Sequence, residues 1–178
     1  LTNDKNLDDR AKSLRNLCFS TNRFIHKELG WNYRMTNMQA ALGVAQMERI
    51  NEIVEKKRYI GNTYNKLLKD IKEVNLPVVR TDYCENIYWV YAITLNDDYH
   101  KTVEEVMFKL GEYKIGTRPF FYPMHKQPVF NKMKLFLNDR LPSSEKLYKK
   151  GFYIPSGLAL AEDQIKEVSV ALHKIFAS

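Results

Sequence analysis

The sequence predicts an α/β fold in which a long helix precedes a small domain of alternating strands and helices. Apolar residues recur at helical spacing from Asn37 to about Ile71. After Pro77, strand-like and helix-like patterns alternate in the order β–α–β–α–β–α, which is typical of a small α/β domain. The 178 residues are enough to bury a sizeable core.

The first 36 residues are expected to hold one short helix and a loop. Asp4 is a suitable N-cap for a helix that runs to about Leu17. A loop then covers residues 19–34. Thr36 and Gln39 have the spacing of a capping box, in which each side chain bonds the other residue's backbone N–H. We therefore expect the long helix to begin directly after Thr36.

That long helix is expected over residues 37–72. Its apolar side consists of Met38, Ala41, Leu42, Ala45, Ile50, Ile53 and Val54. Gly61 weakens the helix without ending it. The remaining residues, 73–178, form the small domain.

The small domain is expected to alternate three strands with three helices. The expected strands cover residues 87–95, 115–118 and 152–154, and the expected helices cover residues 102–112, 143–150 and 162–176. The first strand is rich in aromatic and β-branched residues. Trp89 and Tyr91 alternate with Tyr88 along it, so one set faces inward, and most of these side chains are expected in the core.

Composition excludes several classes of function. The net charge of +7 comes from lysines and arginines spread over the predicted helices, so we expect no nucleic-acid binding. No apolar run approaches the roughly 20 residues that span a bilayer, and no secretory leader is visible. Cys18 and Cys84 lack metal-ligand spacing, which favours free thiols in the cytoplasm and no metal site.

Candidate binding residues gather in the segment 26–43. Asn32 and Arg34 precede a helix N-terminus, where free N–H groups and the macrodipole favour anions such as phosphate. By spacing alone, Asn32 more often caps its own turn, and Arg34 could equally form a structural ion pair. His26 more often bonds the backbone than acts as an acid or base.

A second cluster is Arg118-Pro119-Phe120-Phe121-Tyr122-Pro123-Met124-His125. Its prolines fix the backbone, its aromatic rings form an apolar wall, and Arg118 and His125 supply polar groups. Such a mixture suits a sugar diphosphate. The alternative is a crossover loop packed on the core, with Phe120 and Phe121 buried.

Glu48 is a third candidate, on the long helix. A carboxylate at this position could accept the N–H groups of a guanine edge. Otherwise it is a solvated helical charge paired with a Lys or Arg one turn away.

The ordered motifs resemble those of the DegT/DnrJ/EryC1/StrS family of nucleotide-sugar aminotransferases. They are His-x-x-x-Gly-x-Asn-Tyr-Arg-Met-Thr-Asn-x-Gln-Ala-Ala-x-Gly from His26, Tyr88-Trp89-Val90-Tyr91, and the run from Gly116 to His125. The resemblance covers nearly the whole chain. It implies the C-terminal portion of a pyridoxal-phosphate enzyme of aminotransferase fold type I. Residues 1–36 would be a remnant of its large cofactor domain, residues 37–72 the linking helix and residues 73–178 the small domain.

The resemblance also implies roles for the candidate residues. The family residue that matches Asn32 reaches the cofactor phosphate of the other subunit in a homodimer, and we assign Arg34 to the same site. Glu48, Arg118, Phe120 and His125 would contact the nucleotide-sugar.

The implied reaction moves an amino group from glutamate to a nucleotide-linked 4-keto-6-deoxy sugar. The motifs are most similar to those of perosamine-synthase-type members, which act on GDP-4-keto-6-deoxymannose. The Schiff-base lysine of the family lies upstream of the segment that matches Leu1-Thr2-Asn3-Asp4, so we expect no catalytic residue here and no activity from the chain alone. A related sugar dehydratase and a non-catalytic interaction module are the alternatives.

Overall fold

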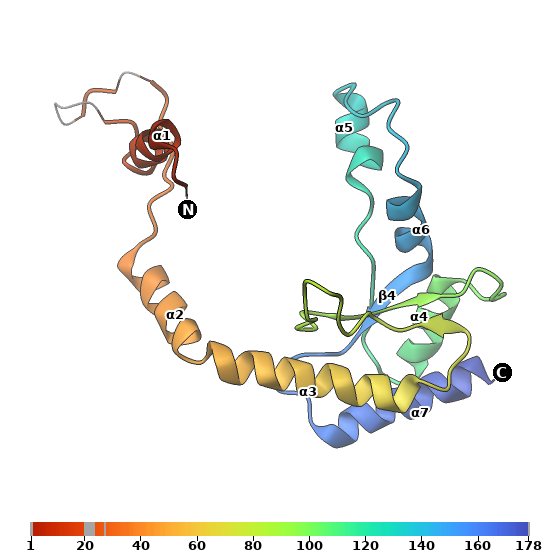
Figure 1. Ribbon diagram of the computed structural model, residues 1–178. Coiled ribbons are helices and arrows are strands. Elements are labelled where there is room, and N and C mark those ends of the chain that lie inside the picture. The colour runs from red at the N-terminus through yellow and green to blue at the C-terminus, as the bar shows by residue number, and fades with distance from the viewer. Residues whose placement is uncertain (1, 20–23, 27, 178) are drawn as a thin grey trace. The chain divides into compact units, whose positions relative to one another are not determined.

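The computed structural model describes residues 2–19, 24–26 and 28–177 (Figure 1). The chain divides into two units, Leu1–Ile50 and Asn51–Ser178. The described part of the first unit contains helices α1 (Lys5–Arg15) and α2 (Asn37–Glu48). Neither helix contains a buried residue.

Both helices begin at the caps that the sequence predicts. The Asp4 side chain accepts hydrogen bonds from the backbone N–H groups of Asn6 and Leu7 at the start of α1. The Thr36 N–H donates to Gln39 Oε1 at 2.9 Å, and the Gln39 N–H donates to Thr36 Oγ1 at 3.3 Å. The predicted capping box is confirmed.

The expected long helix is instead two helices, α2 and α3 (Ile50–Leu68). Arg49 separates them with φ −107° and ψ 9°, and its N–H bonds the Gln46 carbonyl at 3.2 Å, only three residues back. Because one distorted residue does not interrupt helical spacing, the apolar pattern continues across the break. All of α3 after Ile50 belongs to the second unit.

The second unit contains a four-stranded antiparallel sheet in the order β1-β2-β4-β3. Its strands are β1 (Val74–Asn75), β2 (Tyr91–Leu95), β3 (Arg118–Pro119) and β4 (Gly151–Ile154). Strand β4 pairs with both β2 and β3, so that Tyr91 lies opposite Ile154 and Arg118 opposite Tyr153.

The helices of this unit are α4 (Val103–Glu112), α5 (Pro128–Lys132), α6 (Pro142–Lys150) and α7 (Glu162–Phe176), with the short 3-10 helix η1 (Met124–Lys126). Helices α4, α6 and α7 lie where the sequence predicts them, and β1, η1 and α5 were not expected. Strand β2 starts later than expected, because Tyr88 has a left-handed backbone with φ 50°. The Tyr88 N–H donates to Asn86 Oδ1 in a turn.

The core lies between the sheet and helices α3, α4 and α7. Helices α3 and α7 lie side by side (Figure 1), and His173 Nε2 on α7 is 2.9 Å from the Leu67 carbonyl oxygen on α3. The largest fully buried side chains are Tyr64, Tyr88, Tyr91 and Phe152. Cys18 and Cys84 are free thiols, as expected. Over the described ranges, no helix has the length and apolar character to cross a membrane.

Candidate functional site

Side-chain contacts hold the loop before α2 against α1 and against the residues that follow α1. They are an ion pair of Arg10 with Glu28, His26 Nδ1 at 2.8 Å from the Leu17 carbonyl oxygen, and Arg34 Nη2 at 3.0 Å from Asn16 Oδ1. His26 therefore bonds the backbone, as its type predicts. Arg34 bonds an amide rather than a carboxylate, and it forms no ion pair with a described residue.

Gly30 lets this loop approach the segment that follows α1 closely. A Cβ atom at Gly30 would lie 2.1 Å from the Leu17 carbonyl oxygen, closer than any side chain allows. Leu17 and Cys18 themselves have left-handed φ angles of 61° and 52°. The chain leaving α1 is thus strained, and Gly30 is the residue type that fits against it.

Asn32 follows this close approach and is exposed. Its carboxamide forms no hydrogen bond to another described residue, so it does not cap its own turn. An amide can donate to a phosphate oxygen without a charge of its own, and the exposed Arg34 guanidinium lies two residues along. Glu28, the nearby carboxylate, is already paired with Arg10. These residues fit the expected role of binding a phosphate.

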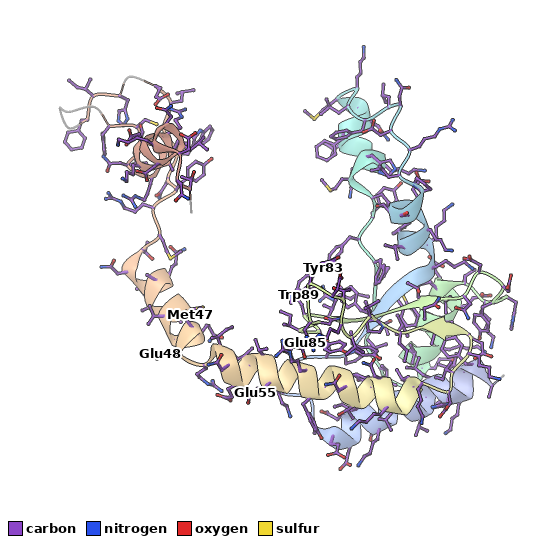
Figure 2. The ribbon with its side chains drawn as sticks, viewed as in Figure 1. Met47, Glu48, Glu55, Tyr83, Glu85 and Trp89 are labelled. Atoms are coloured by element: carbon purple, nitrogen blue, oxygen red, sulfur yellow. The ribbon has the colours of Figure 1, made fainter. Side chains whose placement is uncertain are left out.

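Glu48 is exposed at the C-terminal end of α2 (Figure 2). It forms no ion pair with a described residue, although a partner one turn away was one expectation. A negative charge at a helix C-terminus opposes the macrodipole at a cost of about 0.3–1 kcal/mol. Its position therefore has no stabilising role that the described residues explain.

The second unit contains a pocket of about 420 Å³ at the edge of the sheet. Arg118 lines it from β3, Tyr153 from β4, and Trp89 from the segment before β2 (Figure 2). Helix α3 contributes Lys57, and the turn after β4 contributes Ser156.

An aromatic surface borders this pocket. The rings of Trp89 and Phe121 are parallel within 7° with centroids 6.3 Å apart, and Phe121 also lies 6.4 Å from the Tyr153 ring. Trp89 is 68% exposed, whereas Tyr88 and Tyr91 of the same segment are buried, and Phe121 is 69% exposed, which excludes the alternative in which Phe121 is buried. Phe120 is half-buried against Gly151, where a Cβ atom would meet its ring at 2.3 Å. Phe120 therefore packs on the sheet, and Phe121 provides the exposed ring.

Lys57 is a pocket residue that sequence reasoning missed. Its Nζ donates to the Ser156 carbonyl at 2.6 Å, and burial lowers the pKa of its ammonium group. A signal was present, because Lys57 lies three, four and seven residues before the inward-facing Ile60, Gly61 and Tyr64. A lysine on the buried side of a helix indicates a partner inside the fold.

His125 lies in a different pocket from Arg118, so the structure does not bring the two together as expected. It is buried, with Nε2 3.0 Å from Glu145 Oε1 and Nδ1 unpartnered among the described residues. Lys126 bonds the other Glu145 oxygen at 2.8 Å. Hydrogen bonds from Lys126 and His125 lower the pKa of Glu145 to about 2. His125 thus fastens η1 to α6.

Groups of acidic, His and Cys side chains that could hold a metal ion do not occur in the described part of the chain.

Comparison with known proteins shows the family. The model of the DegT/DnrJ/EryC1/StrS aminotransferase family matches residues 1–173. GDP-perosamine synthase of Escherichia coli O157:H7 is 29% identical over 178 residues, which are 99% of this chain and 46% of the relative. GDP-perosamine synthase of Caulobacter vibrioides is 32% identical over 176 residues, 98% of this chain and 46% of the relative. The chain thus spans about half the length of these curated relatives.

Solved structures show the same fold. Helicobacter pylori PseC, an aminotransferase involved in the biosynthesis of pseudoaminic acid, superimposes with a TM-score of 0.84 at 20% identity, covering 99% of this chain and 47% of that chain. Streptomyces venezuelae DesV superimposes with a TM-score of 0.83 at 21% identity, covering 100% of this chain and 46% of that chain. The α/β fold of an aminotransferase is confirmed. This chain belongs to the DegT/DnrJ/EryC1/StrS family of sugar aminotransferases, which depend on pyridoxal 5'-phosphate.

Proposed function

We propose that the protein containing this chain transfers an amino group from glutamate to GDP-4-keto-6-deoxymannose, as a homodimer. Family membership carries the proposal, because the family model matches residues 1–173. The choice of sugar is supported by two relatives at about 30% identity that are named GDP-perosamine synthases.

Asn32 and Arg34 would bind the phosphate of the cofactor in the neighbouring subunit. The Asn32 amide is exposed and unpaired among the described residues, and Arg34 presents a cation two residues along. When bound, pyridoxal phosphate supplies the electron sink for amino transfer. The role of these two residues is to hold its phosphate, and Gly30 and the Arg10–Glu28 pair fix the loop that carries them.

Arg118 and the aromatic surface beside it would bind the nucleotide-sugar. Arg118 is exposed at the pocket, where a guanidinium can pair with a phosphate in two hydrogen bonds. Phe120 supports this surface by packing on Gly151. The buried His125 is engaged with Glu145, so we assign it the position of the loop rather than contact with the substrate.

Glu48 would recognise the guanine base. Its carboxylate is exposed, unpaired among the described residues and disfavoured by the helix dipole. Two N–H groups on the Watson–Crick edge of guanine match a carboxylate acceptor, and this placement favours GDP-sugars over dTDP-sugars.

The cofactor role can be tested with Asn32→Ala in the intact protein. A hydrogen bond to a charged group contributes about 1.5–3 kcal/mol, so the dissociation constant for pyridoxal phosphate should rise about tenfold or more. Absorbance titration measures this constant, and mass spectrometry detects the aminated GDP-sugar. Asn37→Ala, at another exposed amide on the same segment, is the matched control and should bind the cofactor normally.

Mixing two inactive variants tests whether Asn32 acts across the dimer. Asn32→Ala subunits, mixed with subunits whose cofactor-binding lysine is replaced, should recover part of the activity, because each mixed dimer has one intact site. No recovery, together with normal cofactor affinity of Asn32→Ala, would refute the assignment across subunits. Unchanged preference for GDP-sugars in Glu48→Gln would refute the role of Glu48.

A further inference from the structure

A positively charged projection extends from the sheet of the second unit. It contains α5, α6 and the turns between them, and we call residues 128–150 the basic projection. Figure 1 shows α5 at the far end of this projection, away from helices α3, α4 and α7. The basic projection has six basic and two acidic residues, so it carries +4 of the chain's net charge of +7. A field of one sign on an exposed extension attracts a partner of the opposite sign.

Much of this positive charge is not neutralised within the fold. Lys146 pairs with Asp97 at 2.6 Å, and Lys126 occupies the Glu145 carboxylate at 2.8 Å. Asp139 is the other acidic residue of the basic projection. The cations that form no ion pair with a described residue include Lys132, Lys134, Arg140 and Lys149. Their charges can therefore act on an anionic partner.

Apolar side chains are exposed between these cations. Every residue from 131 to 144 is exposed, and Met133 and Leu137 are each 61% exposed. The run Lys132-Met133-Lys134-Leu135-Phe136-Leu137 thus presents cations and aliphatic side chains from one short segment. Aliphatic side chains gain free energy when a partner removes them from water.

Turns and an aromatic pair shape this segment. The Lys134 N–H donates to the Asn131 carbonyl at 3.0 Å, and the Leu135 N–H donates to the Phe130 carbonyl at 2.9 Å. The rings of Phe130 and Phe136 meet edge to face with their centroids 5.6 Å apart. The aromatic rings therefore pack on each other, and the segment offers mainly aliphatic side chains to a partner.

This combination fits a membrane surface better than a protein or a nucleic acid. Lysine is depleted in protein–protein interfaces, whereas segments that lie on a membrane combine Lys and Arg with aliphatic side chains. Binding of single-stranded nucleic acid relies on aromatic rings that are free to stack, and the two rings here pack on each other. Anionic lipids attract clusters of about four to eight basic residues, and the basic projection has six.

We propose that the basic projection docks the protein on an anionic lipid bilayer. Lys132, Lys134 and Arg140 bind the lipid headgroups, and Met133 and Leu137 enter the boundary between headgroups and acyl chains. Docking of this kind is peripheral and needs no helix that spans the membrane. It goes beyond the proposed reaction and does not depend on it, because none of these side chains lines the pocket at the edge of the sheet.

Co-sedimentation of the intact protein with vesicles tests the proposal. One set of vesicles is phosphatidylcholine alone, and the other contains about 30% phosphatidylglycerol. The protein should bind the anionic vesicles about tenfold more tightly than the neutral ones, and this difference should shrink at higher ionic strength. Lys132→Gln combined with Lys134→Gln should weaken binding to anionic vesicles about tenfold or more, since each lysine near a charged bilayer contributes about fivefold.

The matched control for charge is Lys66→Gln combined with Lys69→Gln. Both lysines are exposed at the C-terminal end of α3 and form no ion pair with a described residue. Helix α3 lies away from the end of the basic projection (Figure 1), and charges more than about 10 Å from the bilayer are largely screened. This control should therefore bind both kinds of vesicle within about twofold of the parent.

The apolar contribution has a test of its own. Met133→Ser combined with Leu137→Ser keeps every charge and should weaken binding to anionic vesicles about tenfold, because less apolar area enters the bilayer. Phe108→Ser combined with Val170→Ser replaces two exposed apolar side chains on α4 and α7 and should bind as the parent does. Circular dichroism should show that each variant keeps its fold.

The proposal is overturned if the variant at Lys132 and Lys134 binds anionic vesicles as its control does, or if the parent binds neither kind of vesicle. It is also overturned if the variant at Met133 and Leu137 changes the sedimentation coefficient and not the vesicle affinity, since the segment would then be an interface between copies. Lysine-dependent binding of a polynucleotide without vesicle binding would reject it too. Amination of the keto sugar, assayed without vesicles, should be the same in all variants, so a failure of the proposed reaction leaves this test unaffected.

Discussion

Both units of the chain contain many apolar residues, but many of these residues are buried in the second unit and most are exposed in the first. The second unit has a continuous core that includes Tyr64, Ile93 and Leu172, all at most 1% exposed. In the first unit, Cys18 is the one buried residue among those described, and α2 exposes Met38 and Leu42 by 81% and 71%. Helix caps, side-chain bonds and a close-packed glycine shape the first unit, whereas burial shapes the second. Apolar spacing alone therefore predicts a helix without predicting what the helix is buried against.

The largest difference should appear when a leucine is truncated in each unit. Leu172→Ala on α7 leaves a cavity in the core and should lower the free energy of unfolding by about 2–5 kcal/mol. Leu42→Ala on α2 removes an exposed side chain and should change it by less than about 0.5 kcal/mol. Urea unfolding of the 178-residue chain, followed by circular dichroism, measures both. An equal cost at both sites would show that α2 is buried in solution.

Two helical glycines should respond with opposite signs. A Cβ atom at Gly61 would lie 2.3 Å from Cγ of Tyr88, a buried ring whose hydroxyl accepts a hydrogen bond from Asn65 Nδ2 at 2.8 Å. Gly61→Ala should therefore destabilise the chain by about 1–3 kcal/mol. A Cβ atom at Gly43 has nothing within 4 Å, so Gly43→Ala should stabilise α2 by about 0.5–1 kcal/mol through helix propensity.

The urea midpoints of the two glycine variants should shift in opposite directions from that of the parent chain. A stabilising Gly61→Ala would mean that Tyr88 is free to move, and with it the turn that places Trp89 at the pocket.

The fold was predictable where local chemistry determines it. The capping box at Thr36, the one at Thr102 and the full extent of α7 all agree with the sequence pattern. The break at Arg49 was not predictable, because it involves neither glycine nor proline and leaves the apolar spacing intact. The late start of β2 depends on the positive φ of Tyr88, which no β-propensity encodes.

The two candidate sites also differ in how far the sequence alone predicts them. The segment with Asn32 and Arg34 is contiguous, so its motif is visible in the sequence. The sheet-edge pocket joins residues from four separate segments, represented by Lys57, Trp89, Arg118 and Ser156. Their meeting depends on strand pairing between β3 and β4, which is long-range information. Sequence reasoning therefore found Arg118 by its motif and missed Lys57.

Two threonine capping boxes, one in each unit, should contribute similar and modest amounts to stability. In the second unit, the Thr102 N–H donates to Glu105 Oε2 at 2.6 Å, much as Thr36 pairs with Gln39 in the first. Thr36→Ala and Thr102→Ala should each cost about 1 kcal/mol, because each removes the hydroxyl oxygen that accepts the backbone N–H of Gln39 or Glu105.

The number of helical residues that lose protection from amide hydrogen exchange should differ between the two units. Helix α4 is anchored by the buried Val103, Val106 and Leu110, so Thr102→Ala should speed amide hydrogen exchange in its first turn alone. Helix α2 has no buried residue, so Thr36→Ala should speed exchange along its whole length, about fivefold for a loss of 1 kcal/mol. Exchange measured residue by residue by NMR distinguishes the two patterns. If faster exchange in Thr36→Ala were confined to the first turn of α2, interactions other than the cap would stabilise this helix. The two units would then differ in burial but not in how far the loss of a cap spreads.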